Sequence, residues 1–314
     1  MARNVTVFGG SGFIGRYVVQ LLAQQGHRIT VAVRRPAQAA FLQPLGNVGQ
    51  ITPVAASLLV EDSVRRAVAG ADLVINLVAV LYEKGRQTFG ALHVAGAERV
   101  ARAALAAGAS DLVQVSALGA SDRASSDYAR SKAAGEAAVR AAFPAAVVLR
   151  PSLVIGPEDD FFNRFAALAR VLPALPLIDG GKTRFQPAWV GDVAAAIVRA
   201  GSDPHCRGKT YELGGPRTYS FKELLQLTLK EIQRRRLLLP LPAGIANVQA
   251  MLLELLPKPP MTRDQIRLLQ QDNVVSDGAL TFADLGLQPT AIESILPTYL
   301  DRYRPGGRYA KATA

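Results

Sequence analysis

Three glycines with a fixed spacing, Gly9, Gly12 and Gly15, follow an apolar run rich in β-branched residues and precede a stretch with helical periodicity. Such a strand, turn and helix expose the first N–H groups of the helix, which bind anions. Glycines at these positions permit a tight turn, let a pyrophosphate approach and allow close packing of helix on strand. The pattern predicts a dinucleotide-binding turn, made of Gly9, Gly10, Ser11, Gly12, Phe13, Ile14 and Gly15.

Two arginines, Arg34 and Arg35, follow the next predicted strand, residues 28–33. Arg34 stands about 20 residues beyond the last glycine, where a turn of this kind meets the adenosine ribose. A carboxylate there binds a 2′-hydroxyl, whereas a guanidinium binds a 2′-phosphate through bidentate hydrogen bonds. The pair therefore predicts NADPH (NADP) as the cofactor, with Arg34 at the expected distance. The alternative is that both arginines are solvated loop charges.

The bulk composition limits the classes of protein to consider. The chain has 314 residues, 49% of them hydrophobic, which suffices for a large α/β unit and a smaller lobe. Its one cysteine excludes an internal disulfide, and its three scattered histidines predict no metal site. The N-terminal residues lead directly into the first strand without a signal peptide, which predicts a cytoplasmic protein.

The formal net charge is +11, and no Asp or Glu precedes Glu61. This excess predicts an anionic partner, such as a nucleotide, an acidic protein surface or an anionic membrane surface. The basic residues neither cluster on one helix nor alternate with stacking aromatics, so no nucleic acid is expected as a partner.

Apolar, strand-like runs alternate with helical stretches through the first half of the chain. This alternation predicts an α/β fold, a Rossmann-type doubly wound parallel sheet, with a smaller C-terminal α+β lobe. The expected domains are 1–155, to which 186–200 returns as a strand and a helix capped by Asp192, and 156–314 as the substrate or partner-docking lobe. Further expected strands are 71–78, 111–116 and 145–150, a short one lies within 46–56, and expected helices are 61–69 and 95–107.

The segment 237–256 is strongly apolar and follows three consecutive arginines, residues 234–236. Prolines and polar residues interrupt it, whereas a bilayer-spanning helix needs about 20 mostly apolar residues. It therefore predicts an element that lies on a membrane surface or docks on a partner. A helix pair whose leucines cover the smaller lobe is the alternative.

The glycine spacing, together with Tyr128 and Lys132 in the string Tyr-Ala-Arg-Ser-Lys, resembles the extended short-chain dehydrogenase/reductase superfamily. The strings at 128–136, 149–164 and 262–269 are similar to the nucleotide-binding accessory subunit of respiratory complex I. Bacterial relatives of that subunit are labelled NAD-dependent epimerase/dehydratase. The resemblance implies an accessory subunit bound to peripheral-arm subunits of complex I, on the inner face of the cytoplasmic membrane.

The resemblance also implies roles for single residues. Tyr128 would be the proton donor or acceptor, and Lys132, one helical turn later, would grip the ribose and favour the phenolate. Catalytic members place a hydroxyl two residues beyond the first serine after the fifth strand, and here Leu118 occupies that position. Leucine donates no hydrogen bond, and only a shift of the loop would bring Ser116 or Ser121 there. The other implied cofactor contacts are Ser57, Leu58, Leu77, Val78, Ala79, Ser116, Pro151 and Val154.

Three functions are compatible with these residues. The favoured one is an NADPH-binding accessory subunit of complex I, structural or regulatory and not itself catalytic. The second is an NADP-dependent reductase, epimerase or dehydratase that uses Tyr128 and Lys132 on a nucleotide sugar or a small carbonyl compound. A nucleotide-sensing or quinone-handling redox protein is the third.

Overall fold

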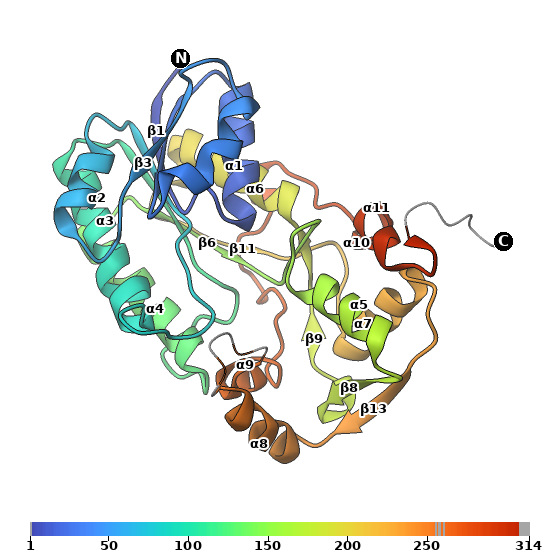
Figure 1. Cartoon of the computed structure of the whole chain (residues 1–314). Coiled ribbons are helices and arrows are strands. Elements are labelled where there is room, and N and C mark those ends of the chain that lie inside the picture. Colours follow the sequence, from blue (N-terminus) through green and yellow to red (C-terminus); the bar gives the residue numbers. More distant parts are fainter. Residues whose placement is uncertain (1, 255, 257–258, 260, 308–314) are drawn as a thin grey trace. The chain divides into compact units, whose positions relative to one another are not determined.

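A seven-stranded parallel sheet organises the first unit of the chain (Figure 1). The computed structural model describes residues 2–254, 256, 259 and 261–307. The spatial order is β11-β6-β5-β4-β1-β2-β3, so the chain reverses its direction of travel between β1 and β4. The strands are β1 (Asn4–Phe8), β2 (Arg28–Val33), β3 (Ile51–Ala55), β4 (Leu73–Asn76), β5 (Asp111–Val115), β6 (Val147–Pro151) and β11 (Thr210–Leu213).

Helices cover both faces of this sheet, which is why its strands are continuous apolar runs. On one face α1 (Phe13–Gln24) packs beside α6 (Val190–Ser202). On the other face lie α2 (Glu61–Val68), α3 (Ala95–Ala106) and α4 (Asp127–Ala142).

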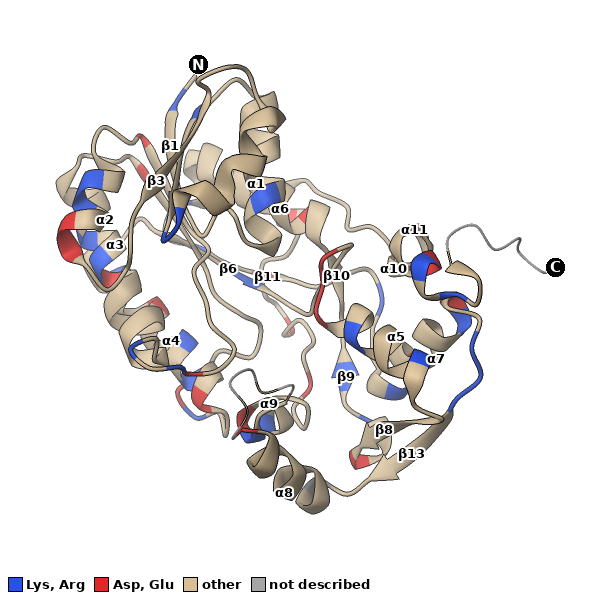
Figure 2. Cartoon of the chain, in the orientation of Figure 1, with Lys and Arg blue, Asp and Glu red and all other residues tan. Residues whose placement is uncertain are grey.

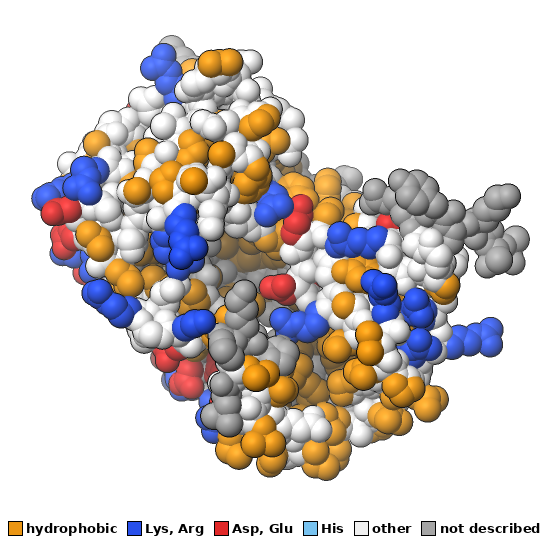
Figure 3. All heavy atoms as spheres, in the orientation of Figure 1, with side chains coloured by type: hydrophobic (Ala, Val, Ile, Leu, Met, Phe, Trp, Pro, Cys, Tyr) orange, Lys and Arg blue, Asp and Glu red, His pale blue; other side chains and the backbone are white. Residues whose placement is uncertain are grey.

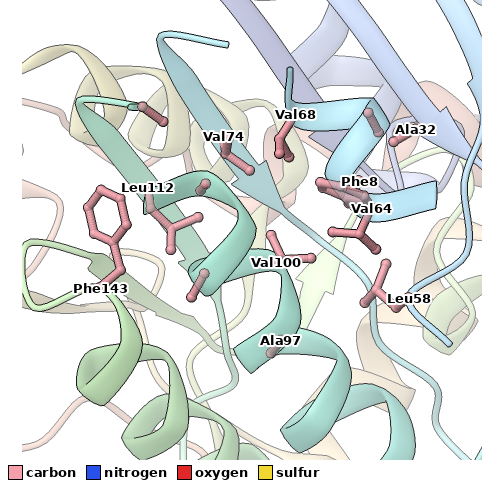
Figure 4. Close-up of a cluster of buried hydrophobic side chains, with 14 of the residues drawn as sticks. Phe8, Ala32, Leu58, Val64, Val68, Val74, Ala97, Val100, Leu112 and Phe143 are labelled. Atoms are coloured by element: carbon pink, nitrogen blue, oxygen red, sulfur yellow. The ribbon is translucent and has the colours of Figure 1, made fainter. Parts of the chain in front are cut away.

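 The core between the sheet and this second set of helices is built from side chains that Figure 4 shows converging from both layers, among them Phe8, Val64, Val100 and Leu112.

Local sequence explains where several of these elements begin and end. Helix α2 carries Glu61 and Asp62 in its first turn and Arg65 and Arg66 in its last turn, which matches the helix dipole at both ends. Helix α3 ends at Ala106, shortly before Gly108, whose φ of +76° a residue with a side chain rarely adopts. A single π-helical turn, η2 (Gly90–Val94), leads into α3.

Within residues 186–200, the helix α6 belongs to the first unit, whereas the expected strand does not. The short strand β10 (Ala188–Trp189) does not join the central sheet but pairs with β7 (Val154–Ile155) in the second unit. The seventh strand is instead β11, which pairs with β6 and buries Tyr211 and Leu213. Asp192 is not the N-cap residue of α6, because the helix begins at Val190 and Asp192 lies within its first turn.

The contacts divide the chain into two units whose boundaries differ from 155 and 186. The first unit comprises Met1–Pro151, Val190–Leu213 and Ser276–Gln288. The second comprises Ser152–Trp189, Gly214–Val275 and Pro289–Ala314. The first segment of the first unit therefore ends at the last residue of β6, and the second segment begins with α6.

The second unit is built around phenylalanines from α5 (Phe161–Val171) and α7 (Phe221–Glu231), which pack edge to face. Ser220 and Glu223 form a reciprocal capping box that starts α7. The remaining strands of the second unit are β8 (Ala174–Ile178), β9 (Arg184–Phe185), β12 (Tyr219–Ser220) and β13 (Leu237–Leu241). Its other helices are α8 (Ala243–Leu253), α9 (Arg263–Leu268), α10 (Ile292–Ile295) and α11 (Pro297–Leu300).

The segment 237–256 forms β13 and α8, and Leu255 lies outside the described residues. One side of α8 is buried, since Ala246 and Ala250 pack against Ile266. The leucines therefore do not simply cover the lobe, because large apolar side chains remain exposed around α8 (Figure 3). Within the segment 237–256, the large apolar side chains that are 48% to 68% exposed are Leu237, Leu239, Ile245, Val248, Met251, Leu252 and Leu256. No helix among the described residues has the length and apolarity needed to cross a bilayer.

Candidate functional site

A cavity of about 280 Å³ opens at the carboxyl ends of β1, β2, β3 and β4, within the first unit. This is the point where the strand order reverses, and open α/β sheets bind ligands there. The sequence-predicted residues that line it are Gly9, Ser11, Gly12, Arg34, Ser57, Leu58, Leu77, Val78 and Ala79. Leu59, Val80, Gln87 and Leu92 also line it and were not predicted.

The glycine turn has the geometry that a phosphate cradle requires. Gly9 has a φ of +78°, and its carbonyl accepts a hydrogen bond from the N–H of Gly12 at 3.0 Å. A Cβ on Gly15 would lie 2.4 Å from the Gly9 oxygen, so only glycine lets α1 approach the turn this closely. Gly10, Phe13, Ile14 and Gly15 support the turn and the first turn of α1 without lining the cavity.

The start of α1 is open to an anion. Gly12 is the N-cap residue and provides no side-chain cap, and the first turn carries no acidic residue. The cavity lining, taken over the described residues, contains one cation, Arg34, and no carboxylate. The uncapped N–H groups, the glycine turn and this charge together suit an anionic ligand such as a dinucleotide pyrophosphate.

The two predicted arginines differ in their relation to the cavity. Arg34 lines the cavity, and its Nη1 donates a hydrogen bond to Oε1 of Gln87 at 2.6 Å. Arg35 precedes the 3₁₀ helix η1 (Pro36–Leu45) and is not among the lining residues. Of the two arginines, Arg34 is therefore the one that meets the cavity.

Tyr128 and Lys132 lie on α4, which Ser126 caps by accepting a hydrogen bond from the N–H of Ala129. Lys132 is buried, and its Nζ donates to the carbonyl of Val115 at 2.9 Å, at the end of β5. Burial lowers the pKa of Lys132 to about 8, although the nearby carboxylate of Glu136 raises it. Burial raises the pKa of Tyr128 to about 12, so its phenol is protonated at neutral pH.

His93 connects Tyr128, Lys132 and Leu118, called the Tyr128 group below, with the cavity. Its Nε2 accepts a hydrogen bond from the N–H of Val80, a residue of the cavity wall, at 3.0 Å. Its Nδ1 lies 2.8 Å from Oγ of Ser131, so the proton resides on Nδ1. The ring packs edge to face on Tyr128, with centroids 5.4 Å apart. A neutral imidazole thus lies in the wall between the Tyr128 group and the cavity.

Burial and the charge of Lys132 lower the pKa of His93 to about 3. Because unfolding lets this histidine bind a proton, stability falls as pH drops below about 6.5. We expect His93 alone to cost about 2 kcal/mol of unfolding free energy between pH 7 and pH 5. In urea titrations at both pH values, His93→Gln should lose this increment, whereas exposed His205→Gln should keep it. Equal pH dependence in His93→Gln and the unaltered protein would contradict a neutral, buried imidazole.

Leu118, at the position where the resemblance implies a hydroxyl, is buried. Its N–H donates to the carbonyl of Pro151 at 2.9 Å, which fixes the loop after β5. Ser121 accepts a hydrogen bond from the N–H of Arg123. Oγ of Ser116 is buried and has no hydrogen-bond partner among the described residues. Ser116 therefore carries a buried hydroxyl whose hydrogen bonding the described part of the chain leaves unsatisfied, although Ser116 is not among the residues that line the cavity.

The remaining predicted contacts, Pro151 and Val154, fall on opposite sides of the unit boundary. Pro151 ends β6 in the first unit, whereas Val154 lies in β7 of the second unit and pairs with Ala188. Val154 is therefore not among the residues that the first unit brings together.

A family model described as "NAD dependent epimerase/dehydratase family" matches residues 5–214, which include the glycine turn, Tyr128 and Lys132. The chain belongs to the NAD dependent epimerase/dehydratase family. The match ends just after β11, so it covers all seven strands of the central sheet.

Three similar proteins illustrate the range of names among related chains. The mitochondrial NADH dehydrogenase (ubiquinone) 1 alpha subcomplex subunit 9 of Arabidopsis thaliana is 39% identical, over 96% of this chain and 78% of the relative. A ceramide reductase of Caulobacter vibrioides is 36% identical over 194 residues, 62% of this chain and 59% of the relative. The structure of DesIV, a dTDP-glucose 4,6-dehydratase of Streptomyces venezuelae, matches with a TM-score of 0.73 at 18% identity, over 96% of both chains.

Proposed function

We propose that this member of the NAD dependent epimerase/dehydratase family is an accessory subunit of respiratory complex I that holds NADPH without turning it over. The observation that carries the proposal is the 39% identity to a NADH dehydrogenase subunit across almost the whole chain. The cavity supports it as well, because the glycine turn and Arg34 suit a phosphorylated dinucleotide. A ligand that binds only the folded state stabilises it by about 2.7 kcal/mol at 100 times its Kd, without any chemistry.

In this proposal the residues of the first unit hold NADPH in three places. The N–H groups at the start of α1 bind the pyrophosphate, and Arg34 binds the 2′-phosphate. Ser57 and Leu58 border the adenosine, and Leu77, Val78 and Ala79 border the ribose on the side of β4. The bound nicotinamide would supply hydride chemistry, and Ser116, Tyr128 and Lys132 are the residues that would meet it.

Three features of the Tyr128 group favour a ligand that stays unreacted. Leu118 provides no hydrogen-bond donor for a developing oxyanion. The Nζ of Lys132 is held by the Val115 carbonyl, and burial raises the pKa of Tyr128 to about 12, which disfavours the phenolate that would act as a general base. Deprotonating such a phenol near neutral pH costs about 1.4 kcal/mol for each pKa unit above the ambient pH.

The exposed apolar side chains of β13 and α8 support docking of the second unit on a partner or a membrane surface. An exposed apolar surface of this kind is typical of an interaction site. Lys and Arg are spread over several elements among Asp and Glu rather than gathered on one helix (Figure 2). We propose peripheral attachment at the inner face of the cytoplasmic membrane, against subunits of the peripheral arm.

The proposal is tested by purifying the tagged protein from its own organism in mild detergent. We expect respiratory complex I subunits to copurify, and mass spectrometry of the denatured material to detect NADPH. A double variant, Leu252→Ser with Val248→Ser, should lose the copurifying subunits and retain the nucleotide, because it alters only exposed positions of α8. Recovery of the unaltered protein free of respiratory subunits would reject the accessory role.

Retention of Tyr128 and Lys132 on one face of α4 favours a second candidate, an NADP-dependent reductase, epimerase or dehydratase. The ceramide reductase among the relatives supports a reductase in particular. Its test is NADPH consumption with carbonyl and nucleotide-sugar substrates, in the unaltered protein and in Tyr128→Phe. Turnover that Tyr128→Phe abolishes would establish this candidate, and no turnover is expected under the accessory role.

A further inference from the structure

The loop between β4 and η2 brings a second side chain to Arg34. Gln87 lies in this loop and lines the cavity, 53 residues beyond Arg34 in sequence. Its Oε1 accepts a hydrogen bond of 2.6 Å from Nη1 of Arg34. Both side chains therefore meet at the cavity, at the end of β2 where a ribose substituent would lie.

The backbone of this loop is arranged to hold Gln87 in place. The N–H of Gln87 donates to the carbonyl of Lys84 at 3.0 Å, and the N–H of Lys84 donates back to the carbonyl of Gln87 at 3.1 Å. Just beyond, Glu83 accepts a hydrogen bond from the N–H of Phe89, a buried residue that stacks on His93. The Gln87 side chain is thus carried by a loop that is fixed on both of its sides.

An uncharged side chain at position 87 preserves the positive charge of Arg34. A glutamate here would form an ion pair with Arg34 and neutralise the cation of the cavity lining. The amide of Gln87 orients the guanidinium and leaves its positive charge available to an anion. The amide also carries its own donor, Nε2, and a phosphate oxygen accepts hydrogen bonds from guanidinium and amide groups alike.

We propose that Gln87 is a specificity-determining residue for the 2′-phosphate, which it serves by orienting Arg34 and by donating its amide N–H. The proposal rests on the NADPH-binding part of the proposed function and not on complex I. It assigns discrimination between NADPH and NADH to a pair of residues from two different βα connections.

Calorimetric titration of the purified chain with NADPH and with NADH tests the proposal. We expect Gln87→Glu to weaken NADPH binding by about 10-fold or more, since like charge replaces a donor beside the phosphate. NADH binding should change by less than about three-fold, because NADH carries no 2′-phosphate. Exposed Gln25→Glu, which adds the same charge at the end of α1, should leave both affinities unchanged.

A double variant shows whether Gln87 acts through Arg34. In an Arg34→Gln background, Gln87→Glu should weaken NADPH binding by less than it does alone, because no guanidinium remains for the new carboxylate to pair with and only its repulsion of the phosphate persists. Equal losses for NADPH and NADH in Gln87→Glu would overturn the role of Gln87 and leave NADPH binding intact. An unaltered protein that binds neither nucleotide would overturn the cofactor assignment together with it. Absence of copurifying respiratory subunits would affect only the accessory role.

Discussion

Replacing Arg34 by aspartate should weaken NADPH binding by about 100- to 1000-fold while changing NADH binding by less than about three-fold. The guanidinium is the cation of the described cavity lining, and hydrogen bonds to charged groups contribute about 1.5–3 kcal/mol. Aspartate adds repulsion of the 2′-phosphate to this loss, and it can accept a hydrogen bond from the 2′-hydroxyl of NADH. The measurement is the dissociation constant of each nucleotide by calorimetric titration at fixed ionic strength.

Arg35→Asp provides a control with the same charge change one residue away. Because Arg35 does not line the cavity, its replacement should weaken NADPH only through a distant, salt-screened interaction. Parallel losses in the two variants, or equal losses of NADPH and NADH in Arg34→Asp, would argue against a 2′-phosphate contact at Arg34.

Local sequence patterns predicted the central sheet well, because each buried strand is a short apolar run next to a turn. The strand at 28–33 is present with those bounds, and the helix expected at 61–69 ends one residue earlier. The seventh strand, β11, was missed, since buried Glu212 interrupts its apolar pattern. That carboxylate is buried because it pairs with Arg150, a partner 62 residues away that no local pattern reveals.

The candidate site was predictable where function depends on backbone geometry and less so where it depends on side chains from distant loops. Gly9 and Gly15 adopt the geometry that their spacing predicted. Gln87 has no sequence signal, because its role depends on meeting Arg34 in space. The hydrogen bonds of Lys132 and His93 likewise depend on a carbonyl at the end of β5 and an N–H in the loop after β4.

Arg150 supports the wall behind the Tyr128 group, and replacing it should have the largest effect on stability. Its Nε and Nη2 bind both carboxylate oxygens of Glu136 on α4, at 3.0 and 2.7 Å. Its Nη1 binds Glu212, which stands opposite it in the register of β11 and β6, at 3.3 Å. The second carboxylate oxygen of Glu212 accepts the N–H of Ser276. One guanidinium therefore ties a helix, two strands and a later segment of the first unit together.

Arg150→Met should lower the unfolding free energy by about 3–5 kcal/mol, because it leaves two buried carboxylates without their cation. Arg150→Lys should cost less, since lysine keeps the charge but not the planar fork. The triple variant Arg150→Met, Glu136→Gln, Glu212→Gln should recover much of the loss, because the penalty comes from the unpaired charges. Urea unfolding at pH 7 measures the free energy of unfolding of all three variants. The control is Arg199→Met, which removes a surface ion pair with Asp203 and should change the free energy of unfolding by less than about 1 kcal/mol. A small effect of Arg150→Met would mean that water already reaches these carboxylates, and the packing around Lys132 would then be looser than its buried Nζ indicates.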